Sequence, residues 1–588
     1  MTTTTERVAH EVANRSARTQ RHMLFFLAGS ACAFELLYLL LVAISPFPGL
    51  HLSSTPLGEQ WNWTFAPSQV LRWLMSPLAT ITSRHEHISA ILLGIALSGL
   101  LGSYVLIITR LHKEYRHGLK TRRWLFLLLG TTLIFGLTLL FQPLLLSDDV
   151  FTHIFSGRIL AVYGADPLNT APIQFAADPY LRWVITGRSS PNVTGPLWLC
   201  LAALLVTLGK TPVITLLLFK GTALCAHLLN VVLVWCILGK VAPSRRFLGT
   251  LLYAWNPLAV IELAGSGHNE GILLCLLLLA TLLYVQSCAR HHQYHHASHA
   301  IAALSPLAYC YSPLALKMYA LLIFGLAISA NLIALLLVPL LICFDLRYKH
   351  GVGKISWSVG WRTLLILLPA LLVSLPFWRG ATTFFAVTSA VDMQHFVYSP
   401  ISLLTAPLHV FFTLAAFLLR FPLFEQPAEA ADVTLRASAT FIFVLIYIHL
   451  FSRVRHAPIT LIAAGKRPDT DPDTIIAGLD TLLGSWGMAI FWYMLLVSGW
   501  FWPWYLLWML WVIILQRLGI FTTAMLILSG TALFIYPFSG FSTGPMTTNQ
   551  AALIFGIPLA YIIVAWARRK QRERITPNYD RRSEAAQN

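Results

Sequence analysis

Charged side chains are scarce in this sequence. Asp, Glu, Lys and Arg make up 11% of its 588 residues, against 57% hydrophobic residues, and the mean hydropathy is +0.69. A soluble domain usually carries about 25% charged residues, so these charges are too few to cover a water-exposed surface. The scarcity excludes a soluble protein and indicates one that lies in a membrane.

Other absences narrow the class further. The eight cysteines include no Cys-x-x-Cys pair, and nearly all lie inside or beside apolar runs, which argues against a disulfide framework or a zinc site. No nucleic-acid motif and no nucleotide-binding loop accompany the net charge of +17. The basic residues instead cluster beside apolar runs, as the positive-inside rule predicts for cytoplasmic loops. Nucleic acid is therefore not expected as a partner.

Apolar runs long enough to cross a bilayer recur along the chain, since each crossing needs about 20 residues. With basic loops placed inside, they predict an all-α, polytopic membrane protein of roughly 12 to 14 spans. A single membrane domain is expected over residues 23–567, between basic cytoplasmic tails at 1–22 and 568–588. The run 195–209 is interpreted as an interfacial or re-entrant helix and 402–420 as an interfacial helix, and the pattern leaves open whether either one crosses.

The most informative polar segment, residues 147–194, follows a predicted exit to the outer face. It opens with Ser147, Asp148 and Asp149. A carboxylate at the hydrocarbon edge is costly unless it is paired or used, and partial burial would raise its pKa and suit it to act as a general base. Alternatively, Ser147 and Asp148 cap a helix over 149–162. The pattern leaves both roles open, and one Asp could cap while the other catalyses.

A second group of polar residues surrounds a break in an apolar run. Asn256 and Pro257 interrupt the run, and such a break is tolerated where the freed backbone lines a protein cavity. Glu262 lies about two turns further along. The polar residues at the mouth of the run are His268, Asn269 and Glu270. Together they offer a cation, an amide and carboxylates, although an ordinary polar turn between two spans is the alternative.

Two further features could contact a substrate. Lys220 lies in the outer half of its predicted span, where its ammonium could hold a lipid phosphate or snorkel to the surface. Trp504 and Tyr505 close an aromatic run that begins at Trp500. Such runs usually form an interfacial belt, but sugars also stack on aromatic faces.

In this order, the motifs resemble those of bacterial polyprenol-phosphate-mannose-dependent α-1,6-mannosyltransferases, which belong to the multispanning glycosyltransferase C class. The resemblance covers about residues 145 to 520. It rests on Ser147-Asp148-Asp149-Val150 with Gly157-Arg158, Tyr163-Gly164-Ala165-Asp166-Pro167, Asp178-Pro179-Tyr180, Thr194-Gly195-Pro196-Leu197-Trp198, Trp255-Asn256-Pro257-Leu258, Gly267-His268-Asn269-Glu270-Gly271 and Pro503-Trp504-Tyr505-Leu506-Leu507-Trp508. The family usually has Tyr where Thr194 stands and Asp where Glu270 stands, and it tends to place a Lys near Asn331.

The resemblance implies an inverting transferase whose base is Asp148 or Asp149, at the start of an extracytoplasmic catalytic loop. The donor would be a polyprenyl-phosphate sugar, and the acceptor a cell-envelope glycan or glycolipid. Cationic help for the leaving phosphate is expected from Arg158, Lys220 and His268. The residues expected to contact substrate are Asn256, Glu262, Asn269, Glu270, Trp504 and Tyr505.

Further expectations concern cofactors and location. The resemblance implies a multi-pass protein of the plasma membrane with no cofactor and no required metal ion, although Asp148 and Asp149 together could bind one. The sequence decides neither the sugar nor the acceptor. The rival class is a transporter or lipid-linked-sugar flippase, which polytopic architecture and intramembrane charges also fit. Internal inverted repeats would favour that class, and none is found.

Overall fold

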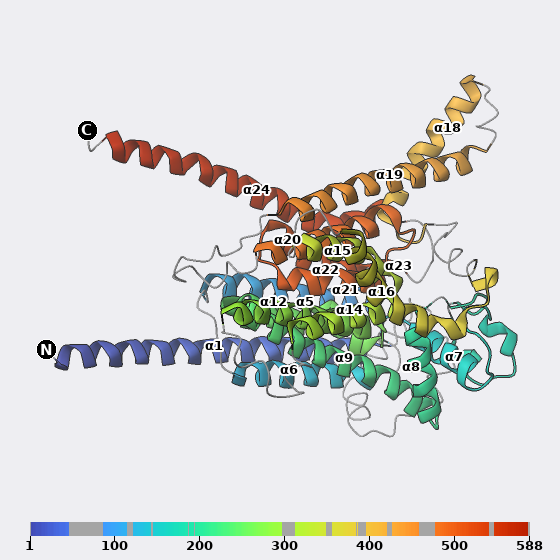
Figure 1. Ribbon diagram of the computed structural model, residues 1–588, viewed down its shortest axis with the longest axis horizontal. Coiled ribbons are helices and arrows are strands. Elements are labelled where there is room, and N and C mark those ends of the chain that lie inside the picture. Colours follow the sequence, from blue (N-terminus) through green and yellow to red (C-terminus); the bar gives the residue numbers. More distant parts are fainter. Residues whose placement is uncertain are drawn as a thin grey trace.

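A computed structural model shows the protein as a bundle of helices (Figure 1). The structure describes residues 2–45, 86–114, 122–142, 145–185, 187–192, 194–296, 312–347, 355–383, 385, 396–419, 426–457, 477–539 and 546–585. No named strand occurs within these ranges, and isolated bridges join Val397 and Tyr398 to Trp500. The expected all-α, polytopic architecture is confirmed.

Twelve helices in the described ranges are long and apolar enough to cross a membrane, or 13 if a bent pair counts as one span. Each of these spans overlaps one of the following helices: α1 (Thr2–Ile44), α5 (Glu86–Glu114), α6 (Arg122–Leu140), α9 (Pro212–Val241), α12 (Glu270–His296), α14 (Pro313–Ala330), α16 (Ile355–Ser374), α18 (Thr405–Leu419), α19 (Pro427–His456), α20 (Ala477–Trp492), α22 (Ile520–Thr531) and α24 (Thr548–Ala585). The bent pair joins α10 (Arg246–Ala254) to α11 (Pro257–Ala259) and a π-helix (Val260–Gly265). The number lies within the predicted range.

Shorter helices complete the fold: α7 (Asp149–Ala161), α8 (Pro196–Leu208), α15 (Val338–Arg347), α21 (Leu507–Leu515) and α23 (Ile535–Ser539). With 13 residues, α8 is too short to cross a bilayer, which agrees with an interfacial or re-entrant helix at 195–209. Residues 402–420 differ from expectation, because Pro400–Leu418 is long and apolar enough to cross. The two predicted tails continue the helices α1 and α24.

Helix starts follow from local sequence. Proline occupies the first position of α8, α9 and α14, where its missing N–H costs no intrahelical hydrogen bond. Thr211 and Ser312 cap the last two of these helices, each accepting a hydrogen bond from a backbone N–H in the first turn. The ends of these apolar helices are therefore set by residues that satisfy the free backbone groups.

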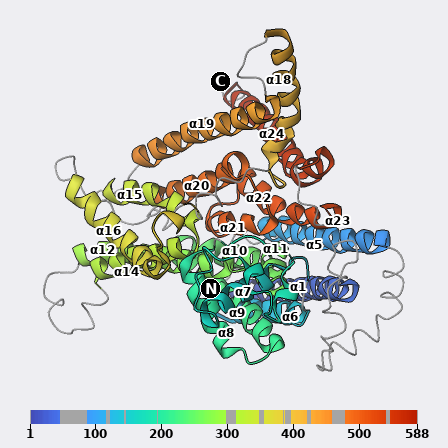
Figure 2. The same cartoon turned by 90° about the vertical axis from the view of Figure 1, so that its right-hand side faces the viewer.

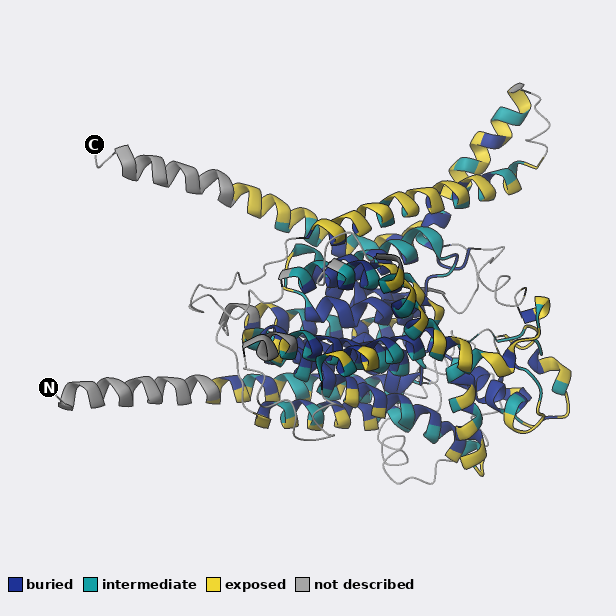
Figure 3. Ribbon diagram, viewed as in Figure 1, coloured by how far each residue is buried: buried dark blue, intermediate teal, exposed yellow. Residues whose placement is uncertain are grey.

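The bundle has two distinct ends. Both chain termini lie on one side, while α7 and α8 lie on the other, at the right of Figure 1 and facing the viewer in Figure 2. We call the latter side the α7 end. The buried core runs through the centre of the bundle, whereas α18, α19 and α24 are largely exposed (Figure 3). Apolar side chains such as Phe417 and Phe441 lie on these exposed faces, as expected where helices face lipid.

Candidate active site

The break at Asn256-Pro257 shapes one wall of the site. The Asn256 side chain is fully buried, accepts a hydrogen bond from the N–H of Ala259, and donates to the hydroxyls of Tyr104 (3.1 Å) and Ser529 (2.9 Å). The chain bends by 46° and continues as a π-helix, a form often found at functional sites. Asn256 therefore holds the bend, and its amide is occupied by protein groups.

The bend delivers Glu262 and His268 to the same place at the α7 end. The His268 Nε2 lies 3.2 Å from a Glu262 carboxylate oxygen, and its Nδ1 lies 4.0 Å from Asp149 and 3.9 Å from Glu270. We call these four residues the His268 cluster. It joins three separate segments: the start of α7, the bent span and the start of α12. The sequence predicted all four members, and the structure brings them together.

Access differs within the cluster. The side chains of Glu262, His268 and Glu270 are 0%, 2% and 5% exposed, whereas that of Asp149 is 32% exposed. Glu262 is held in place because it also accepts a hydrogen bond from the Tyr536 hydroxyl at 2.8 Å. Asp149 is thus the carboxylate of the cluster that a substrate can reach most directly.

The neighbouring Asp148 lies differently. It occupies the N-cap position of α7 but makes no capping hydrogen bond with its side chain. The Ser147 hydroxyl accepts a hydrogen bond from the backbone N–H of Asp149 instead, at 3.2 Å. Asp148 is 3% exposed. The expected cap is therefore supplied by Ser147, and Asp148 is far less accessible than Asp149.

The pKa values in the cluster make His268 a cation and leave Asp149 able to act as a base. Burial opposes charge on His268, but the hydrogen-bonding and charge of Glu262, with Glu270 and Asp149, raise its pKa to about 9. Burial raises the pKa of Asp149 to about 6, with Asp148 and Glu262 acting in the same direction and His268 against it. At neutral pH, His268 carries a positive charge while Asp149 is mostly ionised.

An aromatic surface faces the imidazole. The Trp504 ring stacks on His268 with centroids 4.2 Å apart, and Trp502 stacks on Trp504 at 5.0 Å. Tyr505 stacks on Trp508 and meets Trp504 edge-on. The run predicted from sequence is therefore packed inside the protein beside the cluster, which distinguishes it from an interfacial belt.

Gly267 allows the backbone next to His268 to pass close to Lys220. Its φ of +76° is in the left-handed region, and a Cβ there would lie 3.0 Å from Lys220 Cγ. Only glycine adopts this backbone without strain. The neighbouring Asn269 is half-buried, and its backbone oxygen accepts a hydrogen bond from the N–H of Ile272.

Two predicted phosphate ligands have protein partners. The Lys220 side chain is completely buried, and its ammonium donates to the backbone oxygens of Leu139, at 3.0 Å, and Gln142. Lys220 does not snorkel to the surface, because its ammonium contacts backbone oxygens at the C-terminal end of α6. The contact fixes α6 to α9 behind the His268 cluster.

Arg158 lies on the far side of α7. Its guanidinium reaches Oδ2 of Asp178 through Nε (2.9 Å) and a terminal nitrogen (2.8 Å), and its Nε also donates to Oδ1 at 3.2 Å. The guanidinium covers the Tyr180 ring at 3.9 Å. Asp178 also accepts hydrogen bonds from the Tyr163 hydroxyl and the N–H of Tyr180. The motifs containing these residues thus form a clamp that folds the segment 162–183 against α7.

His153 and Tyr536 are members of the site that the motifs did not indicate. His153 follows Asp149 by one helical turn and so shares its face of α7. Its ring meets Trp198 edge-on at 5.4 Å, and its buried Nδ1 has no hydrogen-bond partner among the described residues. Burial, with the nearby charge of His268, lowers the pKa of His153 to about 3. The i, i+4 spacing from Asp149 was a usable signal for His153.

Comparison with known proteins identifies the family. Residues 58–347 match the family model described as alpha-(1->6)-mannopyranosyltransferase, N-terminal domain. This part of the chain belongs to this family. The match includes Asp149, Glu262, His268 and Glu270, while Trp504 and Tyr536 lie beyond it. Because this family consists of mannosyltransferases, the match makes the chain a glycosyltransferase. No curated protein and no solved structure matches it.

Proposed function

We propose that this protein transfers a mannosyl residue from a polyprenyl-phosphate donor to a glycan or glycolipid of the cell envelope, on the extracytoplasmic face of the plasma membrane. The observation that carries the proposal is the His268 cluster, in which a reachable carboxylate adjoins a buried cation. The family supports mannosyl transfer. The basic segments at the opposite end of the bundle favour an extracytoplasmic position for the α7 end.

Asp149 is the general base in this proposal. Its carboxylate takes the proton of an acceptor hydroxyl as the hydroxyl oxygen attacks the anomeric carbon of a β-linked mannosyl phosphate. The bond from that carbon to the phosphate oxygen breaks, the lipid phosphate leaves with the electron pair, and an α-linkage forms. General-base help of this kind contributes about 10²–10⁴-fold. The exposure of Asp149 favours it over Asp148 for this role.

His268 supplies the positive charge. Its imidazolium is held by Glu262 on one nitrogen and approached by Asp149 on the other, so it can stabilise the charge that develops on the departing phosphate. Trp504 stacks on the imidazole and, with Tyr505, offers a surface for the sugar. Glu270, Asn269 and His153 complete the polar lining. Lys220, Arg158 and Asn256 act in this proposal by positioning the helices around the cluster.

The test is sugar transfer in membranes that contain the overexpressed protein. Radiolabelled polyprenyl-phosphate mannose is supplied alongside polyprenyl-phosphate arabinose and glucose, and labelled product is measured. We expect product from the mannose donor, and a product from another donor alone would contradict the sugar assignment. Activity that survives a chelator would support transfer without a required metal ion.

A further inference from the structure

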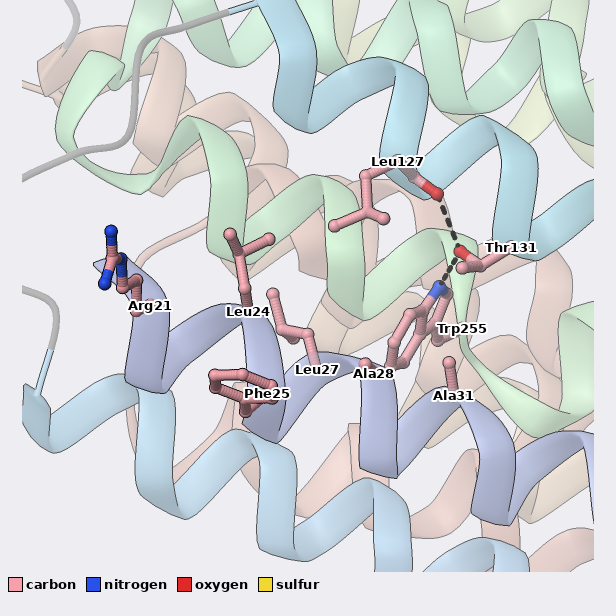
Figure 4. A pocket seen from close by; sticks show the side chains of 9 residues that line it. All are labelled: Arg21, Leu24, Phe25, Leu27, Ala28, Ala31, Leu127, Thr131 and Trp255. Atoms are coloured by element: carbon pink, nitrogen blue, oxygen red, sulfur yellow. Dashed lines mark hydrogen bonds between the residues drawn. The ribbon is translucent and has the colours of Figure 1, made fainter. Parts of the chain in front are cut away.

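A separate cavity opens at the end of the bundle opposite α7, between α1 and α6 (Figure 4). Its volume is about 550 Å³. It is lined by Arg21, Leu24, Phe25, Leu27, Ala28, Ala31, Leu127, Thr131 and Trp255. None of these residues belongs to the His268 cluster, so the cavity is distinct from the candidate active site.

The interior of the cavity offers an occupant no free polar group. Thr131 and Trp255 are its polar members, and they bond to each other: the indole N–H of Trp255 donates to the Thr131 hydroxyl at 2.9 Å. That hydroxyl donates in turn to the backbone oxygens of Leu127 and Leu128. The cavity therefore suits a hydrocarbon chain.

The mouth of the cavity is cationic. Arg21 is the one charged residue in its lining, and it lies at the end remote from Trp255 (Figure 4). Arg122 and Arg123 begin α6, and Arg123 precedes the lining residue Leu127 by one turn on the same helix face. Both are exposed. The cavity thus combines an apolar interior with a mouth suited to an anion.

The depth of the cavity corresponds to one leaflet. Arg21 and Ala31 are ten residues apart on α1, which is about 15 Å along a helix, or half of a hydrocarbon core about 30 Å thick. Beyond them, Trp255 packs on Phe34 and Phe135 with ring centroids 5.8 and 5.7 Å apart. This aromatic layer closes the inner end, so an occupant enters from the leaflet on the Arg21 side.

We propose that this cavity binds an anionic phospholipid, with an acyl chain between α1 and α6 and the headgroup phosphate at Arg21 and Arg123. Charge complementarity selects the anionic headgroup, and the apolar lining takes the chain. The bound lipid fills the space beside Trp255, which directly precedes the bend at Asn256. It therefore stabilises the part of the bundle from which the bent span emerges.

The experiment uses the full chain purified in detergent, with equal amounts of phosphatidylglycerol and phosphatidylcholine. Native mass spectrometry counts the bound lipids, and thermal unfolding measures stability. We expect preferential retention of phosphatidylglycerol and a higher Tm in its presence. Arg21→Gln should reduce the preference about fivefold, since one arginine near a membrane surface contributes about 1 kcal/mol. Arg453→Gln, at the exposed end of α19, is the matched control and should change neither reading.

Ala28→Trp fills the cavity from an exposed position and should abolish retention of the lipid. Arg21→Gln tests the proposal independently of how that variant folds. Equal binding of the two lipids by the wild type, or an unchanged preference in Arg21→Gln, would overturn the proposal. Displacement of phosphatidylglycerol by an equal amount of polyprenyl phosphate would overturn the choice of occupant, because the cavity would then bind the donor lipid.

Discussion

At the scale of single residues, burial and neighbouring charges have opposite effects on the pKa of His268. A buried imidazole alone would be neutral, but three carboxylates within 4.0 Å keep it protonated. Partial burial of Asp149 raises the pKa of its carboxyl group to about 6. Near neutral pH, His268 is then positively charged and Asp149 negatively charged, as base-assisted displacement of a phosphate requires.

This arrangement predicts a bell-shaped dependence of kcat/KM on pH. Activity should rise as Asp149 loses its proton near pH 6 and fall as His268 loses its proton near pH 9. The measurement is the initial rate of transfer across the acidic and the alkaline side of this profile. The variant His268→Gln should have a lower rate, and its rate should not fall at alkaline pH. An alkaline limb retained in His268→Gln would assign that limb to another group.

Gly267 gives a second residue-scale prediction. Gly267→Ala should destabilise the protein by about 1–2 kcal/mol, because alanine resists the left-handed backbone and its Cβ would press on Lys220. Thermal unfolding in detergent measures the change. Gly221→Ala, in α9 with no atom within 4 Å of the added carbon, is the control and should be neutral or slightly stabilising. Equal losses in the two variants would contradict the explanation.

At the scale of elements, the bent span depends on one amide. Asn256 satisfies a helix N-terminus and two hydroxyls at once, and the bend then carries Glu262 and His268 to α7. The element thus connects a buried hydrogen-bond network to the geometry of the site.

Asn256→Ala should lower the free energy of unfolding by about 1–3 kcal/mol, because its buried partners lose their hydrogen bonds. Transfer activity should fall as well, since the bend positions the His268 cluster. Asn256→Ser, which keeps an oxygen for the N-terminus of the next helix, should lie between alanine and the wild type. An alanine variant with unchanged Tm and activity would refute this role.

The clamp between Arg158 and Asp178 yields a prediction about roles. Arg158→Lys and Asp178→Asn should reduce Tm by similar amounts, because each weakens the same charged hydrogen bonds between the two side chains. If the pair acts only in folding, the KM for the donor should change little in both variants. A KM raised in Arg158→Lys alone would instead place the donor phosphate on Arg158.

At the scale of the whole molecule, the sequence predicted more of the architecture than of the contacts. Hydropathy and basic loops predicted an all-α bundle and its approximate number of spans, because both signals are local. The residues of the His268 cluster were identifiable in the same way, since polar groups in apolar runs are conspicuous. Tyr536 was not, because it reaches Glu262 across 274 positions. The partners of Lys220 and Arg158 likewise depend on packing between separate segments.

The orientation of the molecule gives a further prediction. In a cysteine-free background, Gln174→Cys, exposed near α7, should react with a membrane-impermeant maleimide on intact cells. Ser244→Cys, exposed between α9 and α10, should react only after the membrane is opened. The reverse pattern would place the His268 cluster on the cytoplasmic face and contradict the proposed orientation.

The central claim is that Asp149, and not Asp148, takes the proton from the acceptor. It is tested most directly by single-turnover transfer from polyprenyl-phosphate mannose with Asp149→Asn and Asp148→Asn at equal amounts of folded protein. We predict a rate about 10²–10⁴-fold lower for Asp149→Asn, with most activity retained in Asp148→Asn. Full transfer by a folded Asp149→Asn variant would contradict the claim.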